Sequence, residues 1–125
     1  MHTKEKVNSF TDLKVWQVSH QIVLEIYTET KKFPREELFG LVNQLKRAAV
    51  SITSNIAEGF CRSTAKDKIH FYTISLGSLS EVQNQLMIAR DLNFIEFDKF
   101  SAIFEQLFEV RRMIYGLMKS AENRF

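Results

Sequence analysis

The sequence predicts an all-α protein, an antiparallel up-down-up-down four-helix bundle. Apolar residues recur at intervals of three and four along most of the chain, and no segment shows the alternation of a β-strand. One proline and four glycines among 125 residues leave few breaks. These breaks separate four long helical segments joined by short loops, and short loops make consecutive helices run antiparallel.

Residues 1–11 are polar and predict a mobile N-terminal tail, whereas residues 12–125 form the predicted bundle. Thr11 or Asp12 can cap a first helix over about 12–32. Pro34 ends that helix and suits the first turn of a second helix over about 34–58. Gly59 is placed to serve as the C-cap of the second helix.

Thr64, followed by Asp67, resembles a loose capping box and opens a third helix over about 64–92. A short connection then leads into a fourth helix over about 97–121. Gly77 lies inside the third helix, at a cost of about 1 kcal/mol relative to alanine. Because the second helix is also rich in small residues, we expect close contact between these two helices.

Composition and charge describe a soluble globular domain. Seventeen basic and fifteen acidic residues give a net charge of +2, which permits nucleic-acid binding without demanding it. The single cysteine, Cys61, indicates a reducing compartment, and the N-terminus lacks the apolar run of a signal peptide. No segment is apolar enough to span a membrane. We therefore expect a cytoplasmic protein.

A polar row borders the apolar face of the second helix, and a second polar row on the third helix faces it. Either the two rows form a hydrogen-bonded structural seam, or they form a ligand site. Pairing of Arg47 with Glu81 or Glu58 would leave no charge buried alone, which favours the seam. The expected members of the seam are Gln44, Arg47, Ser51, Asn55, Glu58, Ser78, Glu81 and Gln85.

Catalytic and metal-binding patterns are weak. A di-metal bundle needs a Glu-x-x-His pair on each of two helices, and the chain offers only the approximation Asp67 to His70. Cys61 has no histidine beside it, and no Gly-rich phosphate loop is present. We therefore expect no catalytic residues, no metal and no cofactor, and the protein is not expected to be an enzyme.

Basic residues near the second, third and fourth helices are candidate nucleic-acid contacts. In a ring of subunits these residues would repeat, and modest patches would add into a larger positive field. The candidates are Lys46, Arg62, Lys66, Lys68, Arg111 and Arg112.

The apolar faces are broader than one bundle needs. The chain holds eleven phenylalanines, and a monomer of this size would struggle to bury Phe39, Phe60, Phe94 and Phe108 as well as its core. Surplus apolar surface usually marks a subunit interface, so we expect a homo-oligomer.

Several linked motifs resemble one protein family. They are Phe10–Gln17, Phe33–Leu41, Gln44–Ile52, Asn55–Gly59 and Leu76–Glu81. Together they are similar to the four-helix-bundle proteins encoded in intervening sequences of bacterial 23S ribosomal RNA genes, and the likeness covers about residues 10–120.

The resemblance implies a ring-like homopentamer. It also implies a link to the accessory variability proteins of diversity-generating retroelements, which form a basic pentameric barrel that engages a reverse transcriptase and nucleic acid. We therefore expect a non-enzymatic oligomeric adaptor for RNA or for a nucleic-acid-processing protein. The alternative is a protein–protein interaction scaffold without a nucleic-acid role.

Overall fold

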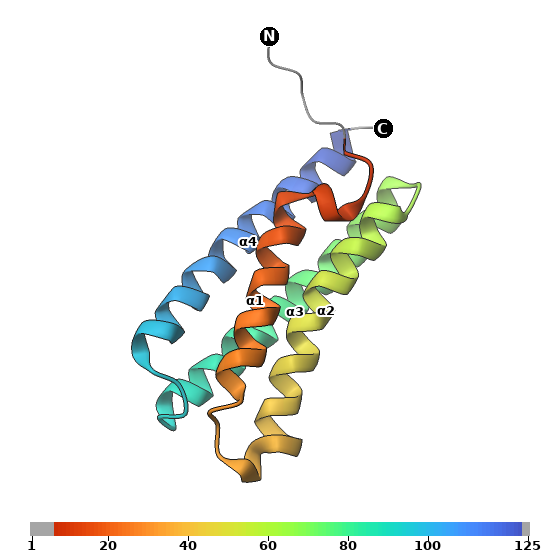
Figure 1. The fold of residues 1–125 in the computed structure, drawn as a ribbon. Coiled ribbons are helices and arrows are strands. Elements are labelled where there is room, and N and C mark those ends of the chain that lie inside the picture. Colours follow the sequence, from red (N-terminus) through yellow and green to blue (C-terminus); the bar gives the residue numbers. More distant parts are fainter. Residues whose placement is uncertain (1–6, 124–125) are drawn as a thin grey trace.

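The computed structural model describes residues 7–123, which form four long helices packed side by side (Figure 1). These are α1 (Lys14–Thr30), α2 (Asn43–Cys61), α3 (Ala65–Asp91) and α4 (Phe97–Asn123). Each helix packs on the next, and α4 returns to α1. Within the described residues there is no strand. The all-helical class and the up-down order are confirmed.

The core lies along the axis of the bundle, and every helix contributes to it. Apolar residues spaced by three and four along each helix point inward and exclude water. Burying each such side chain stabilises the fold by about 1.5–3 kcal/mol. The largest fully buried side chains are Ile22, Ile26, Leu45, Ile52, Ile56, Leu79, Leu86, Ile103, Leu107 and Ile114.

The chain before α1 differs from the predicted tail. Ser9 caps a short 3₁₀ turn, Phe10–Asp12, and the Asp12 carboxylate accepts hydrogen bonds from the backbone N–H groups of Asn8 and Ser9. Asp12 therefore closes this turn, and α1 begins only at Lys14 without a side-chain cap. The predicted cap at Thr11 or Asp12 is wrong. Residues 1–6 of the predicted tail lie outside the described residues.

The connection between α1 and α2 is longer than predicted. Pro34 precedes a 3₁₀ turn, Arg35–Glu37, which runs into a π-helical turn, Leu38–Val42. At Gly40 the backbone leaves helical geometry, with φ −110° and ψ −109°. α2 therefore begins at Asn43 rather than near Pro34, because the irregular turn interrupts the helical hydrogen bonds.

Gly59 allows α3 to approach α2 closely and does not end α2. The helix continues to Cys61, and Gly59 does not have a positive φ. A Cβ atom at Gly59 would lie 2.5 Å from Cε1 of the buried Tyr72 ring and 3.2 Å from the Lys68 carbonyl oxygen. The predicted C-cap role is wrong, because α2 continues to Cys61 and Gly59 instead leaves room for the Tyr72 ring.

Small residues bring α2 and α3 together, as expected, although Gly77 takes no part. The buried Ser75 hydroxyl donates to the Ile52 carbonyl oxygen at 2.9 Å, and the Ser51 and Ser78 hydroxyl oxygens lie 2.7 Å apart. Gly77 is exposed, and a Cβ atom there would meet nothing within 4 Å. Close packing therefore does not explain this glycine.

Replacing Gly77 with alanine should stabilise the protein. The exposed helical position has room for a methyl group, and alanine costs less backbone entropy, so we expect a gain of about 0.5–1 kcal/mol in the free energy of unfolding. Urea denaturation at a fixed protomer concentration measures this change. A loss of stability would show that another surface packs against Gly77.

The start of α3 agrees with the sequence analysis. The Thr64 hydroxyl oxygen accepts a hydrogen bond from the Asp67 backbone N–H at 3.2 Å, as an N-cap should. At the other end of α3, Asn93 adopts a left-handed conformation with φ 61°, and the Phe94 N–H donates to the Ala89 carbonyl oxygen at 2.8 Å. This turn directs the chain into α4.

Candidate functional site

The residues of the predicted seam face one another across α2 and α3, but half of them are exposed. Ser51 and Asn55 are partly buried, and Ser51 joins the two helices through Ser78. The Asn55 side-chain amide donates to the Ser51 carbonyl oxygen at 2.8 Å and to its hydroxyl oxygen at 3.1 Å. The remaining members divide into the buried Gln85 and the exposed Gln44, Arg47, Glu58 and Glu81.

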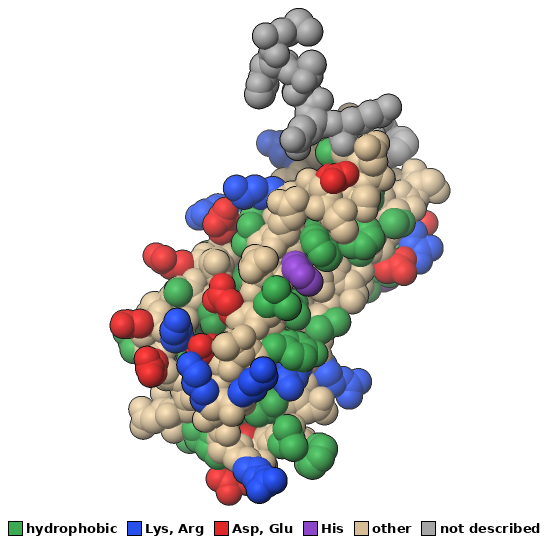
Figure 2. Space-filling model, viewed as in Figure 1, with side chains coloured by type: hydrophobic (Ala, Val, Ile, Leu, Met, Phe, Trp, Pro, Cys, Tyr) green, Lys and Arg blue, Asp and Glu red, His purple; other side chains and the backbone are tan. Residues whose placement is uncertain are grey.

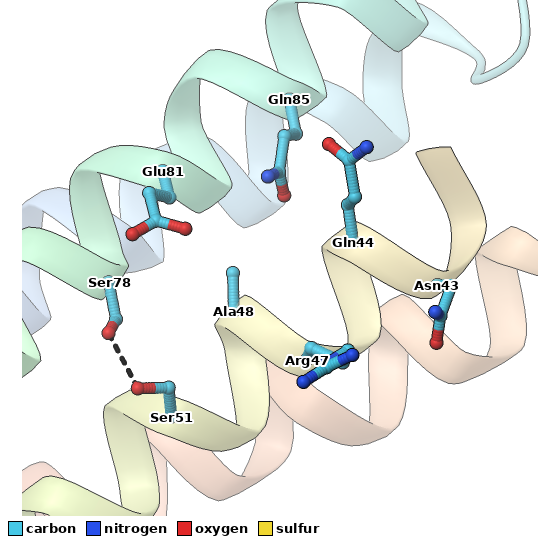
Figure 3. Close-up of a pocket in the computed structure, with 8 residues that line it drawn as sticks. All are labelled: Asn43, Gln44, Arg47, Ala48, Ser51, Ser78, Glu81 and Gln85. Carbon is cyan, nitrogen blue, oxygen red and sulfur yellow. Dashed lines mark hydrogen bonds between the residues drawn. The ribbon is translucent and has the colours of Figure 1, made fainter. Parts of the chain in front are cut away.

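The charged members do not form the ion pairs that the seam required. Among the described residues, Arg47 lies within 4 Å of no carboxylate oxygen, and Glu58 pairs instead with Arg62 at 3.0 Å. Figure 3 shows the Arg47 side chain lying along α2 rather than reaching across to Glu81. The expected pairing of Arg47 with Glu81 or Glu58 is therefore wrong, because Arg47 lies along α2 and Glu58 pairs with a different arginine.

A polar groove of about 510 Å³ occupies the space between α2 and α3. Gln44 reaches from α2 toward Gln85 on α3, while the hydrogen-bonded pair of Ser51 and Ser78 lies farther along the groove (Figure 3). The Oε1 atom of Gln85 is buried and has no hydrogen-bond partner among the described residues. The groove is lined by Asn43, Gln44, Arg47, Ala48, Ser51, Ser78, Glu81 and Gln85.

Two further grooves follow the other side of α2, where it packs against α1 and the turn that connects them. They have volumes of about 500 and 250 Å³, and Lys46 lines both of them. The larger groove is lined by Tyr27, Asn43, Lys46, Arg47, Val50, Ser51 and Ser54. The smaller groove is lined by Thr30, Lys31, Phe33, Pro34, Arg35, Leu38, Val42 and Lys46. We call these two together the α1–α2 groove.

The charged side chains that line the α1–α2 groove are all basic. Four cations line it, Lys31, Arg35, Lys46 and Arg47, and no carboxylate is among its lining residues. None of the four pairs with a carboxylate of the described residues. Lys46 lies over the Tyr27 ring, with Nζ 4.7 Å from the ring centre. Figure 2 shows basic side chains gathered over the lower parts of α1 and α2.

Two of the basic residues singled out from sequence serve the fold. Lys68 is buried, and its ammonium donates to the Phe60 carbonyl oxygen at 2.8 Å and to that of Gly59 at 3.3 Å. A cation at this position satisfies the carbonyl groups that end α2. Arg111 donates to Gln83 Oε1 at 2.7 Å, which links α4 to α3. These contacts do not favour a role for either residue in binding phosphate.

Three other candidates, Arg62, Lys66 and Arg112, are exposed but do not line the groove. Arg62 pairs with Glu58 and lies over the Phe71 ring, whereas Lys66 and Arg112 point into solvent without a polar partner among the described residues. Of the six, only Lys46 lines the groove. Arg35 was not a candidate from the sequence, although Lys31 and Arg35 lie on either side of Pro34, where one turn could bring them together.

The comparisons with known proteins agree with this fold. The family described as 23S rRNA-intervening sequence protein matches residues 11–116. The chain belongs to this family. Its fold is shared by a crystal structure of a protein with unknown function from the S23 ribosomal protein family of Bacteroides thetaiotaomicron VPI-5482, with a TM-score of 0.77 and 22% sequence identity. The similarity covers 84% of this chain and 98% of that one. No curated protein matches the chain.

Family membership and the solved structure therefore agree on the four-helix fold. In the described part of the chain, no group of three or more His, Cys, Asp or Glu side chains is placed to hold a metal ion. None of the described helices combines the length and hydropathy that a membrane span requires.

Proposed function

We propose that this member of the 23S rRNA-intervening sequence family is a non-enzymatic adaptor that binds single-stranded RNA in the α1–α2 groove. The observation that carries the proposal is the set of four unpaired cations in a groove without carboxylates. The whole chain has a net charge of only +2. The four positive charges of the groove are therefore offset by acidic residues elsewhere in the chain. Such concentration is the electrostatic footprint of a nucleic-acid site.

The shape of the groove favours a single strand. It lies between neighbouring helices, whose axes in a bundle are about 8–10 Å apart, too close to admit a double helix. A flexible single strand can follow such a groove with its phosphates on Lys31, Arg35, Lys46 and Arg47. The partly exposed Tyr27 ring, already beside Lys46, supplies an aromatic surface at the same place.

Self-association would multiply this site. We propose a ring-like homopentamer that acts in the cytoplasm, alone or with a nucleic-acid-processing protein. Large exposed apolar side chains support an assembly: Phe39 is 90% exposed, Phe97 68% and Phe108 48%. Phe60 and Phe94, which the sequence analysis grouped with them, are partly buried. A ring would present several copies of the α1–α2 groove and raise the apparent affinity for a long RNA.

RNA binding can be tested directly with the full chain. Fluorescence anisotropy with a labelled single-stranded RNA of about 12 nucleotides, at roughly 50 mM salt, should show saturable binding. A blunt duplex of the same length should bind more weakly, because it cannot enter the groove. Absence of binding to the single strand at low salt would overturn the proposal.

A scaffold without a nucleic-acid role is the second candidate. It is favoured by the π-helical turn before α2, which leaves Phe39 90% exposed and Leu38 48% exposed at one end of the bundle. In that case a single protein should co-purify with the chain, and treatment with nuclease should leave the complex intact. Loss of the partner on nuclease treatment would support the RNA adaptor instead.

A further inference from the structure

The polar groove between α2 and α3 has a chemistry different from that of the α1–α2 groove. It holds one cation and one carboxylate, Arg47 and Glu81, and its other polar groups are side-chain amides and hydroxyls. The Glu81 carboxylate would repel a phosphate, so this groove does not suit an RNA backbone. Amide and carboxylate groups instead suit the hydrogen-bonding edges of a nucleobase.

Gln85 is the central group in this groove. The residue is only 8% exposed, and its Oε1 atom has no hydrogen-bond partner in the described part of the chain. A buried acceptor without a donor costs about 1–3 kcal/mol, so a ligand that supplies an N–H group gains an interaction that the free protein lacks. The exposed Gln44 side chain points toward Gln85 from the opposite wall (Figure 3), and its movement would give a ligand access.

The two grooves are neighbours because they share one row of residues. Asn43, Arg47 and Ser51 line both, and their spacing of four places them along one face of α2. A strand whose phosphates lie on Arg47 and Lys46 therefore needs to cross only this row to place a base between α2 and α3. The volume of about 510 Å³ lies in the range typical of small-molecule pockets.

We infer that the α2–α3 groove binds an unpaired adenine of the single-stranded RNA, with the Gln85 amide on its Watson–Crick or Hoogsteen edge. A glutamine amide pairs with the N6 amine and a ring nitrogen of adenine. Gln85 Oε1 and the Glu81 carboxylate are both acceptors, so the groove favours an exocyclic amine, which carries two N–H groups, over uracil, whose single ring N–H lies between two carbonyl oxygens. The inference rests on the proposed RNA binding and adds base selection to it.

The test compares oligoadenylate with oligouridylate of equal length, at one salt concentration, with wild-type protein and two variants. The wild type should prefer oligoadenylate by about tenfold, the discrimination expected of one good amide–base pair. Gln85→Met keeps the side-chain volume and removes the unsatisfied oxygen, so it should fold and lose the preference while still binding both RNAs. Gln106→Met is the matched control, because Gln106 on α4 also has a buried Oε1 without a described partner and lies outside the groove.

The outcomes separate the two proposals. A preference that is lost in Gln85→Met and kept in Gln106→Met supports the adenine site. Equal binding of both RNAs by the wild type, or a preference that survives Gln85→Met, overturns the adenine site and leaves the α1–α2 groove as an RNA site. Failure of the wild type to bind either RNA contradicts the proposed function, and the adenine site with it.

Discussion

Gly59→Ala is expected to destabilise the protein by about 2–3 kcal/mol, the upper part of the range for overpacked cores. The new Cβ would lie 2.5 Å from Tyr72 Cε1 and 2.8 Å from Cδ1. Tyr72 is only 3% exposed, and the Lys68 carbonyl oxygen blocks the other side at 3.2 Å. The Tyr72 ring must therefore shift or α2 and α3 must move apart, and either change disturbs the packing between the two helices. Urea denaturation at equal protomer concentration measures the loss.

Two further variants test whether the clash with Tyr72 causes this loss of stability. Gly116→Ala, where a Cβ would meet nothing within 4 Å, should leave stability unchanged or raise it by about 0.5–1 kcal/mol. In a Tyr72→Leu background, Gly59→Ala should cost much less than in the wild type, because the ring that it strikes is gone. An equal cost in both backgrounds would mean that the clash with Tyr72 is not the cause.

The double variant Lys31→Glu/Arg47→Glu is expected to weaken RNA binding by about a hundredfold or more, since each charged contact contributes about 1.5–3 kcal/mol. Both side chains are exposed and neither pairs with a described carboxylate. The free energy of unfolding should therefore change by less than about 0.5 kcal/mol. The seam interpretation of Arg47 predicts the reverse, a loss of stability. Anisotropy titrations and urea denaturation of the same samples measure the two effects.

Lys66→Glu/Arg112→Glu is the matched control for this variant. It changes the net charge by the same amount, and both residues are exposed but lie outside the α1–α2 groove. RNA affinity should change little beyond a general electrostatic effect. Equal losses in the two double variants would mean that overall charge, rather than the groove, governs binding.

The sequence predicts the helices well because the spacing of their apolar residues shows which face of each helix is buried. It predicts the turns less well, since the start of α2 depends on the local geometry at Gly40. Gly59 and Gly77 look alike in sequence, yet one lies under Tyr72 and the other in open solvent. The side chain that packs against a helical position comes from another helix, and spacing within one helix does not specify it.

The sequence also predicts only part of the candidate site. The polar row on α2 is visible in the sequence, but side-chain direction decides whether Arg47 meets Glu81 or solvent, and this depends on how α2 packs. The α1–α2 groove gathers Lys31 and Arg35 from the connecting turn with Lys46 from α2. Only the folded turn brings these residues together. Lys68 shows the opposite case, a basic residue that folding buries against carbonyl groups.

The salt dependence of RNA affinity tests the α1–α2 groove most directly. A strand that contacts all four cations should give a slope of about −2.8 in a plot of log affinity against log salt. Affinity should therefore fall about fiftyfold between roughly 50 and 200 mM salt. The Lys31→Glu/Arg47→Glu variant should show a slope about half as steep, or no measurable binding. A wild-type slope near zero, or one that this variant leaves unchanged, would contradict RNA binding in the groove.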